Sequence, residues 1–214
     1  MWKQTKRTIV DGLVATYGVV NIGEKVDNFI ELGIQPLSII AYHNVYFQQV
    51  KDSYIMGSYY PALTGACSLG ERILNHLILT LRDHHKGTPE YQKVFRKKSF
   101  DNWDIVISTL EAWGIFTPDV VSAFNKLKLI RNKSIHFNLE TENSEQVKKD
   151  ALEAIHLLTD IISFQFSAFY KGQPWLIPGM YQNRGIIKKG AENLPFVKEI
   201  LVPNSEKLGY AYIW

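Results

Sequence analysis

Residues 61–81 read PALTGACSLGERILNHLILTL. Apolar residues recur in this stretch at steps of three and four positions, which is the period of an α-helix with one buried face. Pro61 suits the first turn of a helix, where a backbone N–H has no intrahelical partner to lose, and Gly87 and Pro89 end the pattern. The stretch therefore predicts a long helix at the centre of a helical core.

The chain on both sides of this helix has the same helical period. We expect further helices near residues 38–55, 101–113, 118–130 and 144–169, with Asp101 and either Asn143 or Ser144 at the starts of the second and the last. Gly and Pro recur through the last 44 positions and interrupt any long helix there, and aromatic residues are interspersed among them. The prediction is an all-α protein divided into an N-terminal extension, a helical bundle and a loop-rich C-terminal extension, at 1–36, 37–170 and 171–214.

Composition sets broad limits on the class of protein. The chain has 214 residues, of which 46% are hydrophobic, so it can bury a core without disulfides or a structural metal. A net charge of +3 permits a polyanionic partner without requiring one. Cys67 is the single cysteine, which excludes an intramolecular disulfide and a cysteine-rich zinc site. With no secretory signal and no long apolar run, we expect a cytoplasmic protein with no metal, cofactor or membrane partner.

A dense polar cluster follows the helix that begins near residue 118. Residues 128–137 read KLIRNKSIHF. His136 has the reference pKa expected of a group that moves protons near neutral pH, and Arg131 has the planar fork that matches two phosphate oxygens. Asn132 can both donate and accept, and Lys128 and Lys133 flank the cluster as candidate phosphate contacts. Together these groups suit metal-independent cleavage of RNA, in which the 2′-hydroxyl attacks the neighbouring phosphate.

Helical geometry limits this hypothesis. Five residues turn an α-helix by about 500°, which leaves Arg131 and His136 about 140° apart. Either the helix breaks between them, or two copies of the chain face each other across a two-fold axis. The alternative is that both side chains only cap a helix end and offset its dipole, and spacing alone favours that interpretation.

Residues 129–137 resemble the signature of the HEPN superfamily, in which an arginine, a polar residue, a few variable residues and a histidine follow an apolar helix face. The resemblance covers about residues 37–170. It implies an up-and-down bundle of four or five helices, and many members are metal-independent endoribonucleases whose site forms across a homodimer. Members include toxins paired with antitoxins and phage-defence proteins, while others have lost catalysis and only bind nucleotides or RNA.

The resemblance also implies roles for individual residues. His136 would be the general acid or base, Arg131 would hold the phosphate, and Asn132 would help to position them. An acidic residue on an earlier helix often supports the arginine, and Glu71 is the candidate, with Asn75 one turn further on. A carboxylate at the edge of an apolar face is costly unless it is paired, although a solvated glutamate is the alternative.

The sequence thus predicts an endoribonuclease acting on RNA, with an antitoxin or regulatory protein as a candidate partner. The alternative is a non-catalytic module of the same fold that binds RNA or protein. A basic run at 93–98 with interspersed aromatics could follow an RNA backbone, although a solvated helix end is the favoured interpretation. His84 and His85 are adjacent and point apart on a helix, which argues against a metal site.

Overall fold

The computed structural model describes residues 6–135, 143–167 and 187–207, and these residues are mostly helical with no β-strand among them. The all-α prediction is therefore confirmed, whereas the up-and-down arrangement of four or five helices stays a prediction. In this part of the chain no helix is both long enough and apolar enough to cross a membrane. The α-helices are α1 (Lys6–Tyr17), α2 (Ile22–Leu32), α3 (Ala41–Ile55), α4 (Tyr59–Leu81), α5 (Tyr91–Val94), α6 (Trp103–Ala112), α7 (Pro118–Ile135), α8 (Ser144–Phe166) and α9 (Val202–Lys207).

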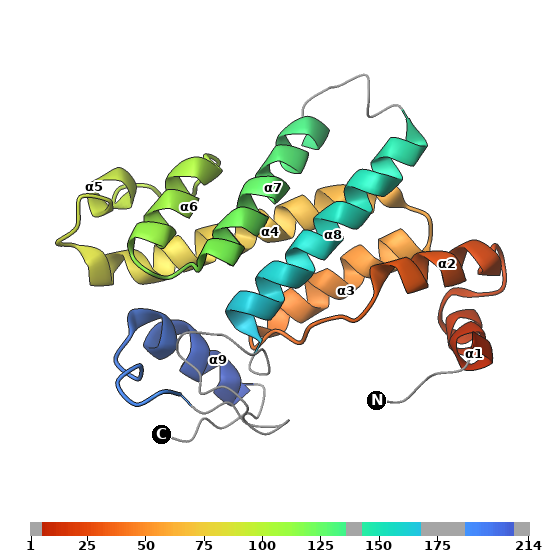
Figure 1. Cartoon of the computed structure of the whole chain (residues 1–214), viewed down its shortest axis with the longest axis horizontal. Coiled ribbons are helices and arrows are strands. Elements are labelled where there is room, and N and C mark those ends of the chain that lie inside the picture. The colour runs from red at the N-terminus through yellow and green to blue at the C-terminus, as the bar shows by residue number, and fades with distance from the viewer. Residues whose placement is uncertain (1–5, 136–142, 168–186, 208–214) are drawn as a thin grey trace.

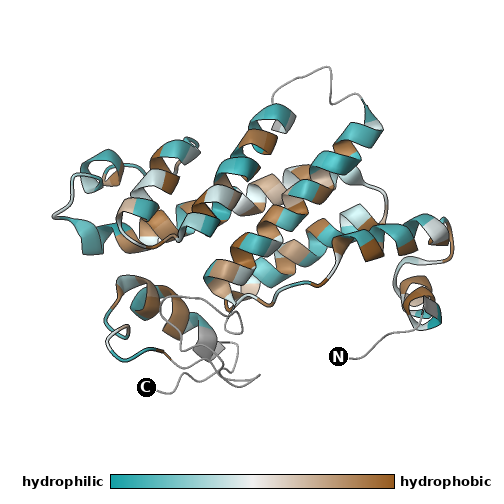
Figure 2. Cartoon of the chain, in the orientation of Figure 1, coloured by the Kyte–Doolittle hydropathy of each residue, from teal (hydrophilic) through white to brown (hydrophobic). Residues whose placement is uncertain are grey.

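Helix α4 is the central element, and it packs against α3, α6, α7 and α8 (Figure 1). Its apolar face is completely buried, as residues 61–81 predict. The ribbons of α7 and α8 alternate between hydrophobic and hydrophilic residues along their length (Figure 2), which is the pattern of helices with one face on a core. Because burial of apolar surface is the main favourable term in folding, these faces fix how the helices meet.

Gly70 allows α4 to approach α6 and α7 closely. A Cβ atom at this position would lie 2.8 Å from Cδ2 of Leu127 and 3.0 Å from Cη2 of Trp103, both closer than packed atoms tolerate. The missing side chain therefore lets Trp103 and Leu127 pack directly on the helix backbone. Glu71, the next residue of α4, is thereby brought up to the same two helices.

Two helix starts are fixed by asparagine caps. Of the two predicted starts of α8, Asn143 is the cap, since its side-chain oxygen accepts from the backbone N–H groups of Glu145 and Gln146. Helix α6 differs from the prediction by one residue: Asn102, not Asp101, caps it and accepts from Asp104 and Ile105. The cap satisfies donors at the first turn that have no intrahelical partner.

The described parts of both predicted extensions contain helices. Asn28 of α2 donates from Nδ2 to the carbonyl of Tyr54 at 3.0 Å, which ties α2 to the end of α3. In the C-terminal extension a π-helical turn at Val197–Leu201 leads into α9, and Phe196 contacts Phe166 at the end of α8. The domain boundaries stay predictions, and most of the predicted loop-rich segment lies outside the described residues.

Candidate active-site cleft on helix α4

An ion pair between Glu71 and Arg131 joins α4 to α7. Nη2 of Arg131 donates to Oε2 of Glu71 at 2.9 Å, and the side chains are 17% exposed for Arg131 and 38% exposed for Glu71. The contact predicted between these two residues is confirmed. Because water still reaches the carboxylate, the pair is only partly desolvated. The charge-assisted hydrogen bond orients the guanidinium.

Trp103 and Asn132 complete the surroundings of the arginine. Nε1 of Trp103 donates to the same Glu71 oxygen at 3.3 Å, and the Arg131 guanidinium lies 5.5 Å from the centre of the tryptophan ring. Nη1 of Arg131 donates to Oδ1 of Asn132 at 3.3 Å. Nε of Arg131 is buried and has no hydrogen-bond partner among the described residues. Nearly all buried polar groups have a hydrogen-bond partner, so this buried donor is an exception in the core.

Arg131 and Glu71 lie in the wall of a cleft of about 550 Å³. Three cationic side chains and one carboxylate share this cleft, so its lining is positively charged even though Glu71 pairs with Arg131. A positive lining of this size suits a phosphate-bearing ligand. The cleft is lined by Cys67, Ser68, Glu71, Arg72, Asn75, Leu79, Lys98, Ser99 and Arg131.

Asn75 supports the cleft through the backbone. Its Nδ2 donates to the carbonyl of Phe100 at 2.9 Å, and its Oδ1 accepts from the Phe100 N–H at 2.7 Å. Nδ2 also donates to the Glu71 carbonyl at 3.0 Å. Asn75, which the resemblance placed beside Glu71 as a further site residue, thus holds the segment that brings Lys98 and Ser99 to the cleft.

Cys67 lies in the cleft wall as a neutral thiol. Burial raises the pKa of Cys67 to about 11, while a hydrogen bond with Ser134 and the positive charge of Arg131 act in the opposite direction. A thiol with a raised pKa is a poor nucleophile at neutral pH. Cys67 is therefore a buried, unreactive part of the cleft wall.

The structure places Lys128 and Lys133 in ion pairs away from the cleft lining. Lys128 pairs with Asp104 of α6, and Nζ of Lys133 lies 3.7 Å from Oδ2 of Asp150 on α8. Their predicted contact with a phosphate therefore has no support in the cleft geometry. The cations that line the cleft beside Arg131 are Arg72 and Lys98.

His136, the predicted proton-transfer group, lies outside the described residues and directly follows the last residue of α7. Of the residues that the sequence did not single out, Trp103 carried no usable signal because its contact with Glu71 spans 32 positions. Lys98 did carry a signal, because it belongs to the basic run at 93–98, for which a solvated helix end is the favoured interpretation.

The adjacent histidines form no metal site with other residues of the described part of the chain. His85 stacks on Trp113 with ring centroids 4.3 Å apart. Within the described ranges no cluster of three or more potential metal ligands occurs.

Comparisons with known proteins add no assignment. No family model matches the chain, and searches of curated proteins and of solved structures also found no match. The case for a function therefore depends on the cleft itself and on the chemistry of its residues.

Proposed function

We propose that this protein is a metal-independent endoribonuclease of the HEPN kind, and that the cleft on α4 is its active site. Arg131 holds the scissile phosphate, Glu71 and Asn132 position Arg131, and His136 moves protons. Arg72 and Lys98 contact neighbouring phosphates in place of Lys128 and Lys133. The 2′-oxygen attacks the neighbouring phosphorus, and the bond from phosphorus to the 5′-oxygen of the next nucleotide breaks. The products are a 2′,3′-cyclic phosphate and a strand with a free 5′-hydroxyl.

The observation that carries the proposal is the state of the Arg131 guanidinium. An arginine has five N–H donors, and bonds to Glu71 and Asn132 use two of them among the described residues. The other three donors are one N–H on each of Nη1 and Nη2 and the buried N–H of Nε. The side chain lines a cleft with two more cations. A fixed guanidinium with donors to spare is suited to the extra negative charge of a phosphorane-like transition state.

The ion pair with Glu71 gives the arginine a defined orientation before RNA binds. Fixing donors in advance lowers the cost of reorganisation when charge develops on the phosphate. A histidine five positions after Arg131 supplies the remaining requirement, a group that can accept the proton of the 2′-hydroxyl or donate one to the leaving oxygen.

The test is cleavage of RNA by purified protein in EDTA, with analysis of the new ends. We expect 2′,3′-cyclic phosphate or derived 3′-phosphate ends, and a loss of at least about 100-fold in rate for His136→Ala and Arg131→Ala. His156→Ala serves as the matched control, since His156 is an exposed histidine on α8 outside the cleft. If the wild type and His136→Ala cut every RNA alike, the proposal is wrong.

The rival is a non-catalytic binding module, in which the same cations hold RNA without cutting it. RNA binding without His136-dependent cleavage would favour that module. A toxin or phage-defence setting predicts slow growth on expression of the wild type and normal growth with Arg131→Ala or His136→Ala. The homodimer that the resemblance implies is tested by measuring the mass of the protein in solution.

A further inference from the structure

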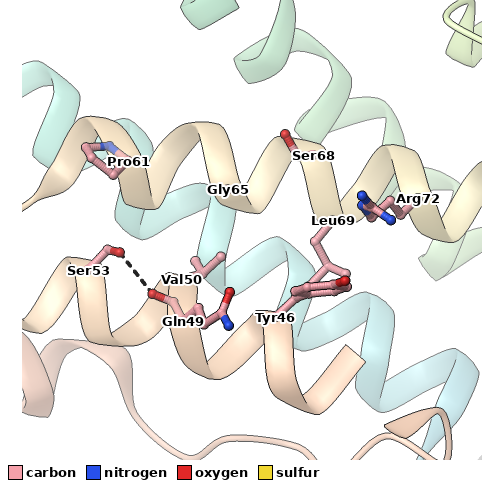
Figure 3. Close-up of a pocket in the computed structure, with 9 residues that line it drawn as sticks. All are labelled: Tyr46, Gln49, Val50, Ser53, Pro61, Gly65, Ser68, Leu69 and Arg72. Carbon is pink, nitrogen blue, oxygen red and sulfur yellow. Dashed lines mark hydrogen bonds between the residues drawn. The ribbon is translucent and has the colours of Figure 1, made fainter. Parts of the chain in front are cut away.

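A second, smaller cavity lies between α3 and α4 beside the active-site cleft. It encloses about 250 Å³. Figure 3 shows Tyr46 and Arg72 at one end of this cavity and Ser53 and Pro61 at the other, with the Gln49 side chain between them. Its size is below the range of drug-sized ligand pockets, so it suits a single ring system.

The cavity and the cleft adjoin along one face of α4. Ser68 and Arg72 line both of them. From Pro61 in the cavity to Leu79 in the cleft, α4 extends by about 27 Å at 1.5 Å per residue. Gly65 keeps α3 close to α4 here, because a Cβ at this position would lie 3.0 Å from Cγ2 of Val50. The two hollows therefore lie next to each other on α4, with Ser68 and Arg72 in the linings of both.

The chemistry of the two ends differs in a way that matches a nucleotide. The cleft carries Lys98, Arg72 and Arg131, which suit phosphates. In the cavity, Tyr46 is 38% exposed, and the Arg72 guanidinium lies 5.3 Å from the centre of its ring. The guanidinium covers one face of the ring, and both an aromatic ring and an arginine plane are surfaces on which bases of single-stranded nucleic acid stack.

We propose that the cavity between α3 and α4 is a nucleobase subsite for single-stranded RNA, placed next to the phosphate cleft by Arg72. The base stacks on Tyr46 and Arg72, and the amide of Gln49, which can donate and accept, contacts its edge. The identification of the ligand as RNA rests on the proposed function of the cleft. The subsite itself is a separate prediction about binding.

The experiment measures binding of a fluorescein-labelled single-stranded RNA of mixed sequence to full-length protein in EDTA. The His136→Ala background prevents cleavage, and fluorescence anisotropy gives the Kd. Tyr46→Ala is expected to raise the Kd about fivefold or more, whereas Tyr46→Phe keeps the ring and stays within about twofold. Arg72→Ala should also raise the Kd and reduce the dependence of binding on salt by about one phosphate contact. Tyr60→Ala is the matched control, because Tyr60 is an exposed tyrosine of α4 that lies outside both hollows.

A second series identifies the base. Replacing one nucleotide at a time by an abasic residue should weaken binding at a single position, and that loss should disappear in Tyr46→Ala. Thermal unfolding of each variant checks that the exposed substitutions leave the fold intact. The subsite is overturned if Tyr46→Ala binds RNA as tightly as Tyr60→Ala, or if abasic losses are the same in both.

Failure of the subsite and failure of the proposed function give different results. If the protein binds single-stranded RNA through Tyr46 and does not cut it, the subsite is supported and the ribonuclease proposal is contradicted. If the protein cuts RNA in a His136-dependent manner and Tyr46→Ala has no effect on binding, the ribonuclease proposal is supported and the subsite is contradicted. Tight binding of a peptide with no binding of RNA would also overturn the subsite.

Discussion

Arg131 near the end of α7 and Glu71 in the middle of α4 are separated by 60 positions in the chain and by 2.9 Å between Nη2 and Oε2. Gly70 makes this approach possible, since any larger residue there would collide with Trp103 and Leu127. The pair therefore links the packing of the core directly to the candidate site. The contribution of this ion pair to stability depends on how far water screens the two charges. With Glu71 38% exposed, the pair lies between a surface pair and a buried one.

The first prediction concerns the coupling between these two residues. A double-mutant cycle with Glu71→Ala and Arg131→Ala, measured by urea unfolding, should give a coupling energy of about 1–2 kcal/mol. The pair between Lys128 and Asp104 is the control, because Asp104 is 70% exposed, and its cycle should give less than about 0.5 kcal/mol. Equal coupling in the two cycles would mean that Glu71 does not hold Arg131 in place.

The second prediction concerns Gly70. Alanine is favoured over glycine in a helix by about 1 kcal/mol, but the added methyl group would meet Trp103 and Leu127 in a packed core. We expect Gly70→Ala to lower the free energy of unfolding by about 1–2 kcal/mol. Gly12→Ala in α1 is the matched control, since nothing lies within 4 Å of its Cβ position, and it should be neutral or stabilising by up to about 1 kcal/mol. A stabilised Gly70→Ala would contradict the close packing of these helices.

The third prediction is a loss of stability in acid that depends on His43. This side chain is fully buried, with Nδ1 3.0 Å from Oγ of Ser38, and its ring contacts Phe166 and Tyr42. Burial, together with the smaller effect of the charge of His76, lowers the pKa of His43 to about 3. The unfolded chain binds a proton at this residue from about pH 6.5 downwards, whereas the folded chain does so only near pH 3.

Stability should therefore fall as the pH drops through this interval, by up to about 1.4 kcal/mol per pH unit from this one group. In His43→Gln the contribution is absent, because glutamine does not titrate. We expect the wild type to be more stable than His43→Gln at pH 7, and the difference to shrink steadily between pH 6 and pH 4.5 in urea titrations. A difference that stays constant over this range would show that His43 is not held neutral by the fold.

The fold class could be predicted because it is encoded in local patterns. The three- and four-residue steps of residues 61–81 identify α4, and Asn143 identifies the start of α8. The sequence was less informative about α1, whose glycine and β-branched residues leave its period ambiguous, although the structure has a helix at Lys6–Tyr17. Tertiary contacts such as the bond from Asn28 to the Tyr54 carbonyl decide such segments, and no local pattern reports them.

The candidate site could be predicted only in part, for a similar reason. Arg131 was identified from the motif and Glu71 from the family resemblance, and the position of Glu71 at the edge of an apolar helix face gave it a reason to pair. Lys128 and Lys133 were chosen for being near the motif in sequence, yet in the structure they pair with Asp104 on α6 and Asp150 on α8. Arg72 reaches the cleft because it is adjacent to Glu71 on a long helix, and that position has meaning only once the cleft is known.

The last prediction tests whether the segment before α6 is held in place by Asn75. The amide of Asn75 satisfies both the N–H and the C=O of Phe100, and no other residue type can do this with the same geometry. Asn75→Ala leaves these two backbone groups without their partner, which should cost about 2 kcal/mol in urea unfolding. The segment would then position Lys98 and Ser99 less well, so RNA binding in the His136→Ala background should weaken about threefold or more.

The control for this prediction is Asn102→Ala. This variant removes a helix cap close by and should cost about 1 kcal/mol of stability, but it leaves the bonds to Phe100 intact. If the two variants weaken RNA binding to the same degree, the effect comes from lost stability alone, and Asn75 has no separate part in shaping the cleft.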